Sequence, residues 1–218
     1  MFARIFQRFS GLVLPYSVTV VALLHLVGVI GLLSPFEPYF RLLTPFNLIA
    51  CGLILWINHN ENSQGLRWFM GIVFVLGFVV EYLGVTYGWI FGHYSYGATL
   101  GPKLAGVPVI IGLNWLLIIY CVSVLTDLLP VPLSLKVVSG ATLAVLIDTL
   151  IEPVAIRYDF WSWDAGFVPL QNYLGWFMVS LVMISLYHLF KVKSENRLAL
   201  PYYFIQLFFF LVLVVAVR

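Results

Sequence analysis

Two carboxyl side chains stand one helical turn apart in a chain that carries little charge. Asp148 and Glu152 belong to the segment DTLIEP at positions 148–153, at the end of a long apolar stretch. Four residues make about one turn of an α-helix, so both carboxyls project from the same face. A carboxylate at membrane depth costs roughly 2.5–3.5 kcal/mol on insertion scales, so this pair indicates acid–base chemistry or transport.

The composition identifies the solvent around these carboxyls as lipid. Hydrophobic residues make up 62% of the chain and charged residues 9%, and the mean hydropathy is +1.04. So few polar residues cannot cover the surface of a water-soluble protein. We therefore predict an integral membrane protein.

The apolar runs set the number of membrane-spanning elements. A helix needs about 20 apolar residues to cross a hydrocarbon core of about 30 Å. Runs of this kind lie near residues 15–33, 41–57, 66–87, 107–126, 133–151, 170–190 and 200–217. We predict an all-α fold, a polytopic transmembrane bundle of about seven helices. Because no repeat or linker interrupts the pattern, residues 1–218 are expected to form a single integral membrane domain.

Basic residues predict the orientation of the bundle. With seven spans, one side carries Arg4, Arg8, Arg67, Lys136, Lys191, Lys193 and Arg197, and the other carries Arg41, Lys103, Arg157 and Arg218. Cytoplasmic loops are richer in Lys and Arg, so the N-terminus is expected in the cytoplasm, with the first span retained rather than cleaved. Loops that are not acidic favour an ordinary bacterium, and hence its inner membrane, over a halophile.

Three polar residues are expected at one depth. Glu81 and Asp148 each lie a few residues before the end of parallel spans, and Asn114 lies about two turns into the span between them. At 1.5 Å of rise per residue, all three lie some 5–10 Å below the same interface. The alternative is that Glu81 and Asn114 only join helices by hydrogen bonds, as polar residues do in membrane bundles.

Two long loops close over this layer. The first, residues 87–108, contains His93, Tyr94 and Tyr96, and the second, residues 152–164, contains Trp161 and Trp163. Aromatic residues are enriched at membrane interfaces, so a plain aromatic belt is the alternative to a binding site. A belt does not explain the charged residues that gather in the same loops, which are Lys103, Arg157, Asp159 and Asp164. Loops this long in a compact bundle are typically functional.

The motifs together resemble those of the membrane-embedded carotenoid hydratases. They are GHYSY at 92–96, LGPKLAGVP at 100–108, NW at 114–115, DTLIEP at 148–153 and WSW at 161–163, within a resemblance that covers about residues 66–190. The resemblance implies an enzyme, a hydro-lyase that adds water to the terminal double bond of an acyclic end group. Its implied substrate is γ-carotene, lycopene or a related carotenoid.

The chemistry of such a hydration assigns roles to the residues. Protonation of a trisubstituted alkene gives a tertiary carbocation, so the site needs a poorly solvated acid beside electron-rich groups. We expect Asp148 to protonate the alkene and Glu152, nearer the interface, to position or deprotonate the water. Glu81 is the competing choice for either role. The tyrosine and tryptophan rings can stabilise this cation by cation–π contacts. The expected substrate-binding residues are Asn114, His93, Tyr94, Tyr96, Trp115, Trp161 and Trp163.

Partners and cofactors follow from the same patterns. No glycine-rich phosphate loop or cluster of metal ligands occurs, so no cofactor and no metal are expected. The net charge of +2 is spread over the loops, which excludes nucleic acid. The expected partners are the carotenoid, water, the lipid bilayer and other enzymes of the pathway.

Other functions stay open at this stage. Buried carboxylates also serve proton-coupled transporters, although these are typically built from two matching halves. A prenyltransferase or terpene cyclase would need two Asp-rich magnesium motifs, of which positions 148–152 supply at most one. A purely structural role, with the loops docking other enzymes of the pathway, would tolerate substitution of Asp148 and Glu81.

Overall fold

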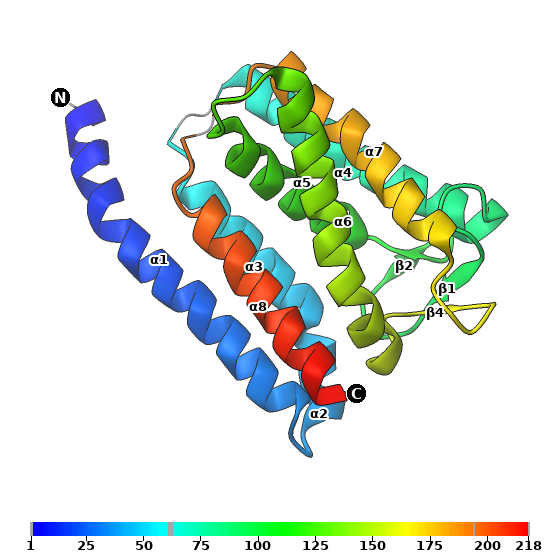
Figure 1. Cartoon of the computed structure of the whole chain (residues 1–218). Coiled ribbons are helices and arrows are strands. Elements are labelled where there is room, and N and C mark those ends of the chain that lie inside the picture. The colour runs from blue at the N-terminus through cyan, green and yellow to red at the C-terminus, as the bar shows by residue number, and fades with distance from the viewer. Residues whose placement is uncertain (1, 61–62, 194, 218) are drawn as a thin grey trace.

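The structure, a computed structural model, describes residues 2–60, 63–193 and 195–217, with side chains from residue 14 onward (Figure 1). The side chains of Arg4 and Arg8, and Arg218, which entered the orientation argument, lie outside the described part.

Long helices build almost the whole molecule. They are α1 (Phe2–Leu32), α3 (Thr44–Ile57), α4 (Gln64–Tyr87), α5 (Ile111–Asp127), α6 (Leu133–Arg157), α7 (Leu170–Leu189) and α8 (Ala199–Val217). The short helices α2 (Glu37–Phe40) and η1 (Arg41–Leu43) lead into α3. In the described part of the chain, 6 segments are long and apolar enough to cross a membrane, and α5 is a shorter apolar helix. The predicted all-α membrane bundle is confirmed.

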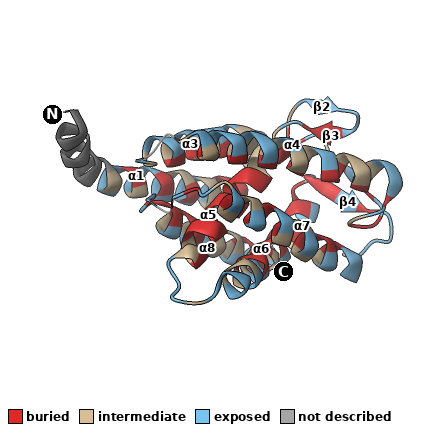
Figure 2. Cartoon of the chain, turned by 90° about the horizontal axis from the view of Figure 1, so that it is seen from above, coloured by how far each residue is buried: buried red, intermediate tan, exposed pale blue. Residues whose placement is uncertain are grey.

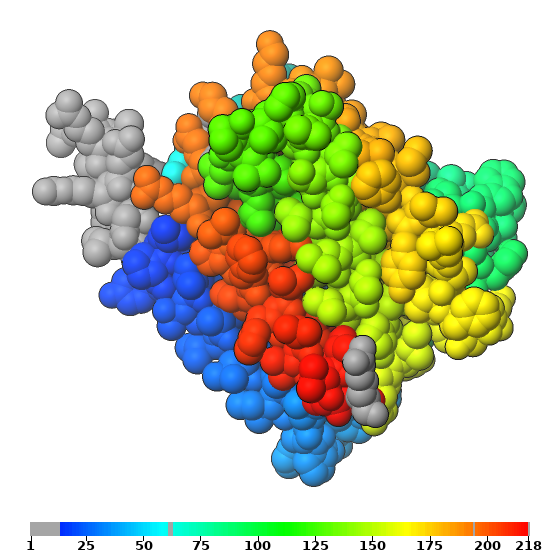
Figure 3. All heavy atoms as spheres, in the orientation of Figure 1, coloured from blue at the N-terminus to red at the C-terminus, as the bar shows by residue number. Residues whose placement is uncertain are grey.

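The helices pack around α5, which is buried along most of its length. Figure 3 shows α1, α8, α6 and α7 side by side over one face of the bundle. Apolar side chains such as those of Leu23, Phe208 and Val215 are exposed. Figure 2 shows exposed positions along the outer faces of the helices. An apolar exterior of this kind is stable in lipid and marks an integral membrane protein.

The fifth predicted span ends later than expected. The prediction placed its end at residue 151, before Pro153, but α6 continues to Arg157. Proline keeps a helix-compatible φ and removes one backbone N–H donor, so a helix supported by its neighbours can continue through it. The next turn closes normally, because the backbone N–H of Tyr158 donates to the carbonyl of Val154 at 3.0 Å. Glu152 therefore lies within a helix and not in the following loop.

The two loops at this end contain short strands. β1 (Tyr94–Tyr96) pairs with β4 (Trp161–Trp163) in an antiparallel sheet, and β2 (Lys103–Leu104) pairs with β3 (Val107–Pro108). Ala105 and Gly106 form the turn of the second hairpin with φ of 49° and 84°, the positive values that a tight two-residue turn requires. This hairpin occupies the region predicted to begin the fourth span at 107, so α5 starts at Ile111 instead.

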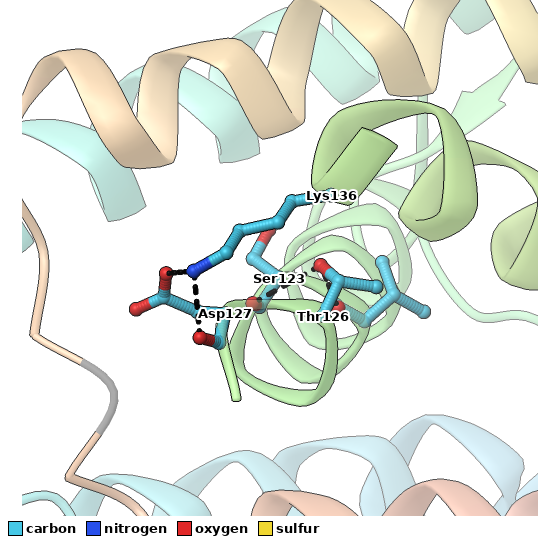
Figure 4. Close-up of polar contacts among 5 residues, drawn as sticks. Ser123, Thr126, Asp127 and Lys136 are labelled. Carbon is cyan, nitrogen blue, oxygen red and sulfur yellow. Dashed lines mark hydrogen bonds and ion pairs between the residues drawn. The ribbon is translucent and has the colours of Figure 1, made fainter. Parts of the chain in front are cut away.

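An ion pair fixes the opposite end of the bundle, where α5 turns into α6 (Figure 4). Lys136 Nζ donates to the backbone oxygen and to Oδ1 of Asp127, both at 2.8 Å. Thr126 Oγ1 donates to the carbonyl oxygen of Val122 at 2.9 Å in the same last turn of α5. These bonds fix the turn between two helices that both carry residues of the site described next.

Candidate active site

The β1–β4 sheet turns four aromatic side chains toward the helices. Its register pairs Tyr94 with Trp163 and Tyr96 with Trp161. Side chains alternate between the two faces of a strand, so the aromatic residues share the inner face, while the residue between them on each strand is an exposed serine. The sheet therefore covers the ends of α4, α5, α6 and α7 with two phenols and two indoles.

Glu81 of α4 accepts hydrogen bonds from three of the surrounding aromatic side chains. Trp115 Nε1 donates to Oε1 at 2.8 Å. Tyr96 donates its hydroxyl to Oε2 at 2.6 Å, and Tyr94 donates its hydroxyl to the same oxygen. The carboxyl is 4% exposed. Three donors of this kind satisfy a buried carboxylate, which otherwise would cost several kcal/mol to remove from water.

Glu152 of α6 is held by the other strand in the same way. Trp161 Nε1 and Trp163 Nε1 donate to Oε2 at 3.0 and 2.9 Å. Asn172 of α7 donates its Nδ2 to Oε1 at 3.1 Å. Indole and amide N–H groups can only donate, so the site offers Glu152 three donors and no acceptor at these positions.

Asp148 lies one turn deeper on α6 and is bonded differently. The same Asn172 Nδ2 donates to Oδ2 of Asp148 at 2.9 Å. The other oxygen, Oδ1, is buried and has no hydrogen-bond partner among the described residues. Asp148 thus has one donor where Glu81 and Glu152 have three each, so a proton on Asp148 would displace fewer hydrogen bonds.

The tyrosines of β1 stay protonated under ordinary conditions. Burial, followed by the negative charge of Glu81, raises the pKa of Tyr94 well above its usual value. The same two causes raise the pKa of Tyr96. Both side chains therefore remain phenols that donate to Glu81, and neither competes with it as a base.

A small polar pocket lies between the carboxyls and the sheet. Its volume is about 20 Å³. It is lined by Glu81, Phe91, Tyr94, Tyr96, Ile111, Asn114, Glu152, Trp161, Trp163, Asn172 and Trp176. Asp148 does not line it, because Asp148 lies behind Glu152 and Asn172. A space of this size with several polar partners accommodates one water molecule.

A larger apolar cavity of about 350 Å³ adjoins the polar pocket. Ile111, Asn114 and Trp161 line both spaces. At its other side the cavity reaches the outer surface of the bundle, because its lining includes Val27 of α1 and Phe46 of α3, which are 52% and 67% exposed. The apolar cavity therefore extends from the lipid-facing surface to residues that also line the polar pocket.

Stacked indoles close the inner side of the pocket. The rings of Trp115 and Trp176 are stacked with centroids 3.9 Å apart and 18° between their planes. Phe91 stacks on Trp115 at a centroid distance of 6.1 Å. Trp115 itself is fully buried and does not line the pocket. It positions two residues that do, because it donates to Glu81 and stacks on Trp176.

The structure brings together most of the residues that the sequence singled out. Glu81, Asn114, Glu152 and the aromatic residues of both strands meet at one pocket, and Asp148 lies directly behind it. His93 does not join them, because its side chain is exposed and its ring lies over Gly88. The alternation along β1 explains this: the residue before Tyr94 points away from the carboxyls.

Sequence reasoning missed Asn172, which bonds both carboxyls of α6. It lies near the start of a span, where a polar residue is ordinary at a membrane interface, so no pattern marks it. Trp176 was missed as well. It follows Asn172 by four residues and so lies on the same face of α7, a spacing that becomes informative once Asn172 is known. Among the described residues, no three His, Cys, Asp or Glu side chains are grouped to hold a metal ion.

Comparison with known proteins identifies the family. The profile of the family described as "Carotenoid biosynthesis protein" matches residues 41–218, well over half of the chain. The chain belongs to this family. As a member of the carotenoid biosynthesis protein family, it is also similar to a bisanhydrobacterioruberin hydratase from Haloarcula japonica. The two are 26% identical over 201 residues, which cover 83% of this chain and 67% of the relative. No solved structure matches.

Proposed function

We propose that this membrane protein is a carotenoid hydratase. It adds water to the terminal double bond of an acyclic end group in γ-carotene, lycopene or a related carotenoid. The observation that carries this proposal is the junction of two spaces at Asn114 and Trp161. There, an apolar cavity that reaches the lipid-facing surface ends at a water-sized pocket lined by Glu81 and Glu152. The name of the Haloarcula relative supports the same reaction class.

The cavity fits the end of a polyene. A carotenoid is about as long as the hydrocarbon core is thick, so its end group lies near an interface while the chain remains in lipid. In this arrangement the end group enters between α1 and α3, past Val27 and Phe46, and reaches Trp161. The rest of the polyene stays outside the bundle, since the cavity is too small for a whole carotenoid.

The carboxyl pair on α6 supplies the proton. The two buried carboxyls that share the amide of Asn172 are most stable with one proton between them, because two adjacent buried negative charges repel each other. Asp148 was expected from the sequence to be the acid. The pocket lining favours Glu152 for the contact with substrate, with Asp148 behind it as the partner that shares the proton. The shared proton passes from Asp148 to Glu152, and Glu152 delivers it to the terminal alkene carbon.

The indole rings stabilise the cation, and Glu81 accepts the proton that the attacking water releases. The tertiary cation left by protonation is stabilised by the indole rings of Trp161, Trp163 and Trp176, whose contacts are worth about 2 kcal/mol when desolvated. A water molecule in the polar pocket forms the C–O bond and passes its extra proton to Glu81. Return of that proton to the α6 pair restores the starting state, so each cycle consumes one alkene and one water.

Expression in a bacterial host that accumulates lycopene or γ-carotene tests this function. We expect a more polar pigment, heavier by one water, in chromatography with mass spectrometry. Glu152→Gln should lower its yield by about a hundredfold or more, the usual contribution of a positioned acid. Asp164→Asn is the matched control, because this carboxyl lies next to β4 but is exposed. An unchanged pigment pool with inserted protein would refute hydration of these two substrates.

The distribution of charge supports an orientation in a bacterial inner membrane. Among the described residues, Arg67, Lys136, Lys191, Lys193 and Arg197 lie at the end opposite the sheet. Arg41, Lys103 and Arg157 lie at the sheet end. The richer end is the cytoplasmic one by the positive-inside rule. The N-terminus is then cytoplasmic, and the active site faces the other side of the membrane.

A further inference from the structure

The apolar cavity contains two buried polar side chains that the hydration chemistry does not use. His25 of α1 and Gln206 of α8 are 4% and 6% exposed, and both line the cavity. Most other lining side chains are apolar, among them Leu24, Phe209 and Phe210. A polar group inside a membrane bundle is costly unless it is bonded, so such a pair indicates a polar ligand group.

The two side chains lie beside each other. Tyr202, Gln206 and Phe209 follow one another at spacings of four and three residues, so they share one face of α8. The ring of His25 makes edge contacts with both flanking rings, with centroids 6.0 Å from Tyr202 and 5.3 Å from Phe209. His25 therefore faces the same stripe of α8 on which Gln206 lies.

Their hydrogen bonding leaves complementary groups for a ligand. His25 Nδ1 lies 2.8 Å from the carbonyl oxygen of Val21, so Nδ1 carries the proton and Nε2 is an acceptor. Nε2 has no hydrogen bond among the described residues, and neither has the side-chain amide of Gln206. A hydroxyl satisfies both, because it donates one hydrogen bond and accepts another.

We propose that His25 and Gln206 bind a hydroxyl group on the same isoprenoid chain whose terminal alkene reaches the carboxyls. The hydroxyl donates to His25 Nε2 and accepts from the amide of Gln206. This rests on the proposed function, which it extends from acyclic hydrocarbons to acyclic isoprenoid alcohols as preferred ligands. A reaction that introduces oxygen into the chain then supplies the preferred ligands.

The position of His25 sets the spacing that the ligand needs. His25 precedes Leu32 by seven residues on α1, which is about 10 Å along the helix. Leu32 lines the same cavity and lies at the sheet end, where its carbonyl accepts the hydroxyl of Tyr158 at 3.1 Å. The ligand hydroxyl therefore binds about two turns of α1 away from the sheet end of the cavity.

Binding of short isoprenoids to the purified full chain in detergent tests the proposal without turnover. Geraniol carries the isopropylidene alkene at one end and a hydroxyl at the other, and 2,6-dimethylocta-2,6-diene is the same skeleton without the hydroxyl. Calorimetric titration should give a dissociation constant for geraniol about tenfold lower than for the hydrocarbon, the effect of one hydrogen bond of ordinary strength. Farnesol, one isoprene unit longer, should show a smaller preference.

Two variants assign that preference to its residues. Gln206→Met and His25→Phe keep side-chain volume and ring contacts, and each should abolish the preference while leaving hydrocarbon binding unchanged. Gln64→Met, at an exposed glutamine of α4, should leave the preference intact. Equal affinity for the two ligands, no binding of geraniol, or a preference that survives both cavity substitutions would overturn the proposal. Failure of hydration in the pigment assay with this preference intact would instead refute the proposed reaction alone.

Discussion

Asn172 on α7 donates its amide Nδ2 to Oδ2 of Asp148 at a distance of 2.9 Å. The same nitrogen donates to Glu152 at 3.1 Å, so one amide joins two carboxyls that are a helical turn apart. The NH₂ group has two hydrogens, one for each acceptor. Asn172 thus links the acid that faces the pocket to the carboxyl behind it, and it joins α6 to α7.

Substitution of Asn172 should affect both stability and turnover. Asn172→Leu removes a donor from two buried carboxyls, and each bond left unmade costs about 1–3 kcal/mol. We expect a lower thermal unfolding temperature in detergent and loss of hydrated pigment in the lycopene host. Gln171→Leu is the control, because this neighbouring amide is exposed and donates to the backbone oxygens of Gly88 and Trp89. A fully active and stable Asn172→Leu protein would contradict the linking role.

The indoles of β4 should act through their N–H groups as well as their rings. Trp161→Phe with Trp163→Phe keeps aromatic faces but leaves Glu152 with Asn172 as its remaining donor. We expect the double variant to insert normally and to hydrate at least about tenfold more slowly, because each lost hydrogen bond leaves the carboxyl of Glu152 less firmly positioned. Pigment yield per inserted protein measures this. Trp89→Phe, an exposed tryptophan, should be unaffected; an equal loss there would point to expression and not to Glu152.

Two glycines of α4, Gly84 and Gly71, should differ in how well they tolerate substitution by alanine. A Cβ added at Gly84 would lie 2.7 Å from the hydroxyl oxygen of Tyr94 and 2.9 Å from the ring of Phe91. Gly84→Ala therefore displaces Tyr94 from Glu81, at a cost of about 1–3 kcal/mol for overpacking. Lower activity and a lower unfolding temperature are expected. Gly71→Ala on the same helix meets nothing within 4 Å and should leave both unchanged. Equal behaviour of the two variants would show that Tyr94 tolerates displacement.

The phenols of β1 predict a loss of stability at alkaline pH. Burial and the charge of Glu81 raise the pKa of Tyr94 above its usual 10.0, whereas the unfolded chain ionises near that value. Tyr94 therefore keeps its proton to a higher pH in the folded state than in the unfolded chain. Its contribution to the free energy of unfolding is complete below about pH 10 and is lost as the pH rises through the folded pKa. Unfolding temperatures in detergent between about pH 8 and about pH 11 should fall less steeply for Tyr94→Phe than for Tyr39→Phe, an exposed control. Identical slopes would contradict the raised pKa.

The sequence predicted the helices and the depth of the site because both follow from simple periodicities. Apolar run lengths located the spans, and residue rise placed Glu81 and Asp148 at one end of the bundle. Asn114 was expected two turns into its span and lies instead in the first turn of α5. Its predicted neighbourhood was nevertheless correct, since it lines the same pocket as Glu81.

The details beyond depth depend on tertiary contacts that no local pattern records. Two strands of three residues each, far apart in the chain, have no propensity signal strong enough to predict their pairing, so the inward side of β1 was unknown. His93 was grouped with Tyr94 and Tyr96 for that reason. The second loop was expected to begin at residue 152, but packing of α6 against α7 and α8 supports the helix as far as Arg157.

The pairing of Tyr94 with Trp163 and Tyr96 with Trp161 means that the two loops cannot vary independently. Insertion or deletion of a single residue in one strand would reverse its alternation and replace aromatic donors with outward-facing serines. Either change would deprive one glutamate of its donors and would misalign the donors of the other. Length changes are therefore tolerable only outside 94–96 and 161–163, and within these strands the loops can vary only by substitution.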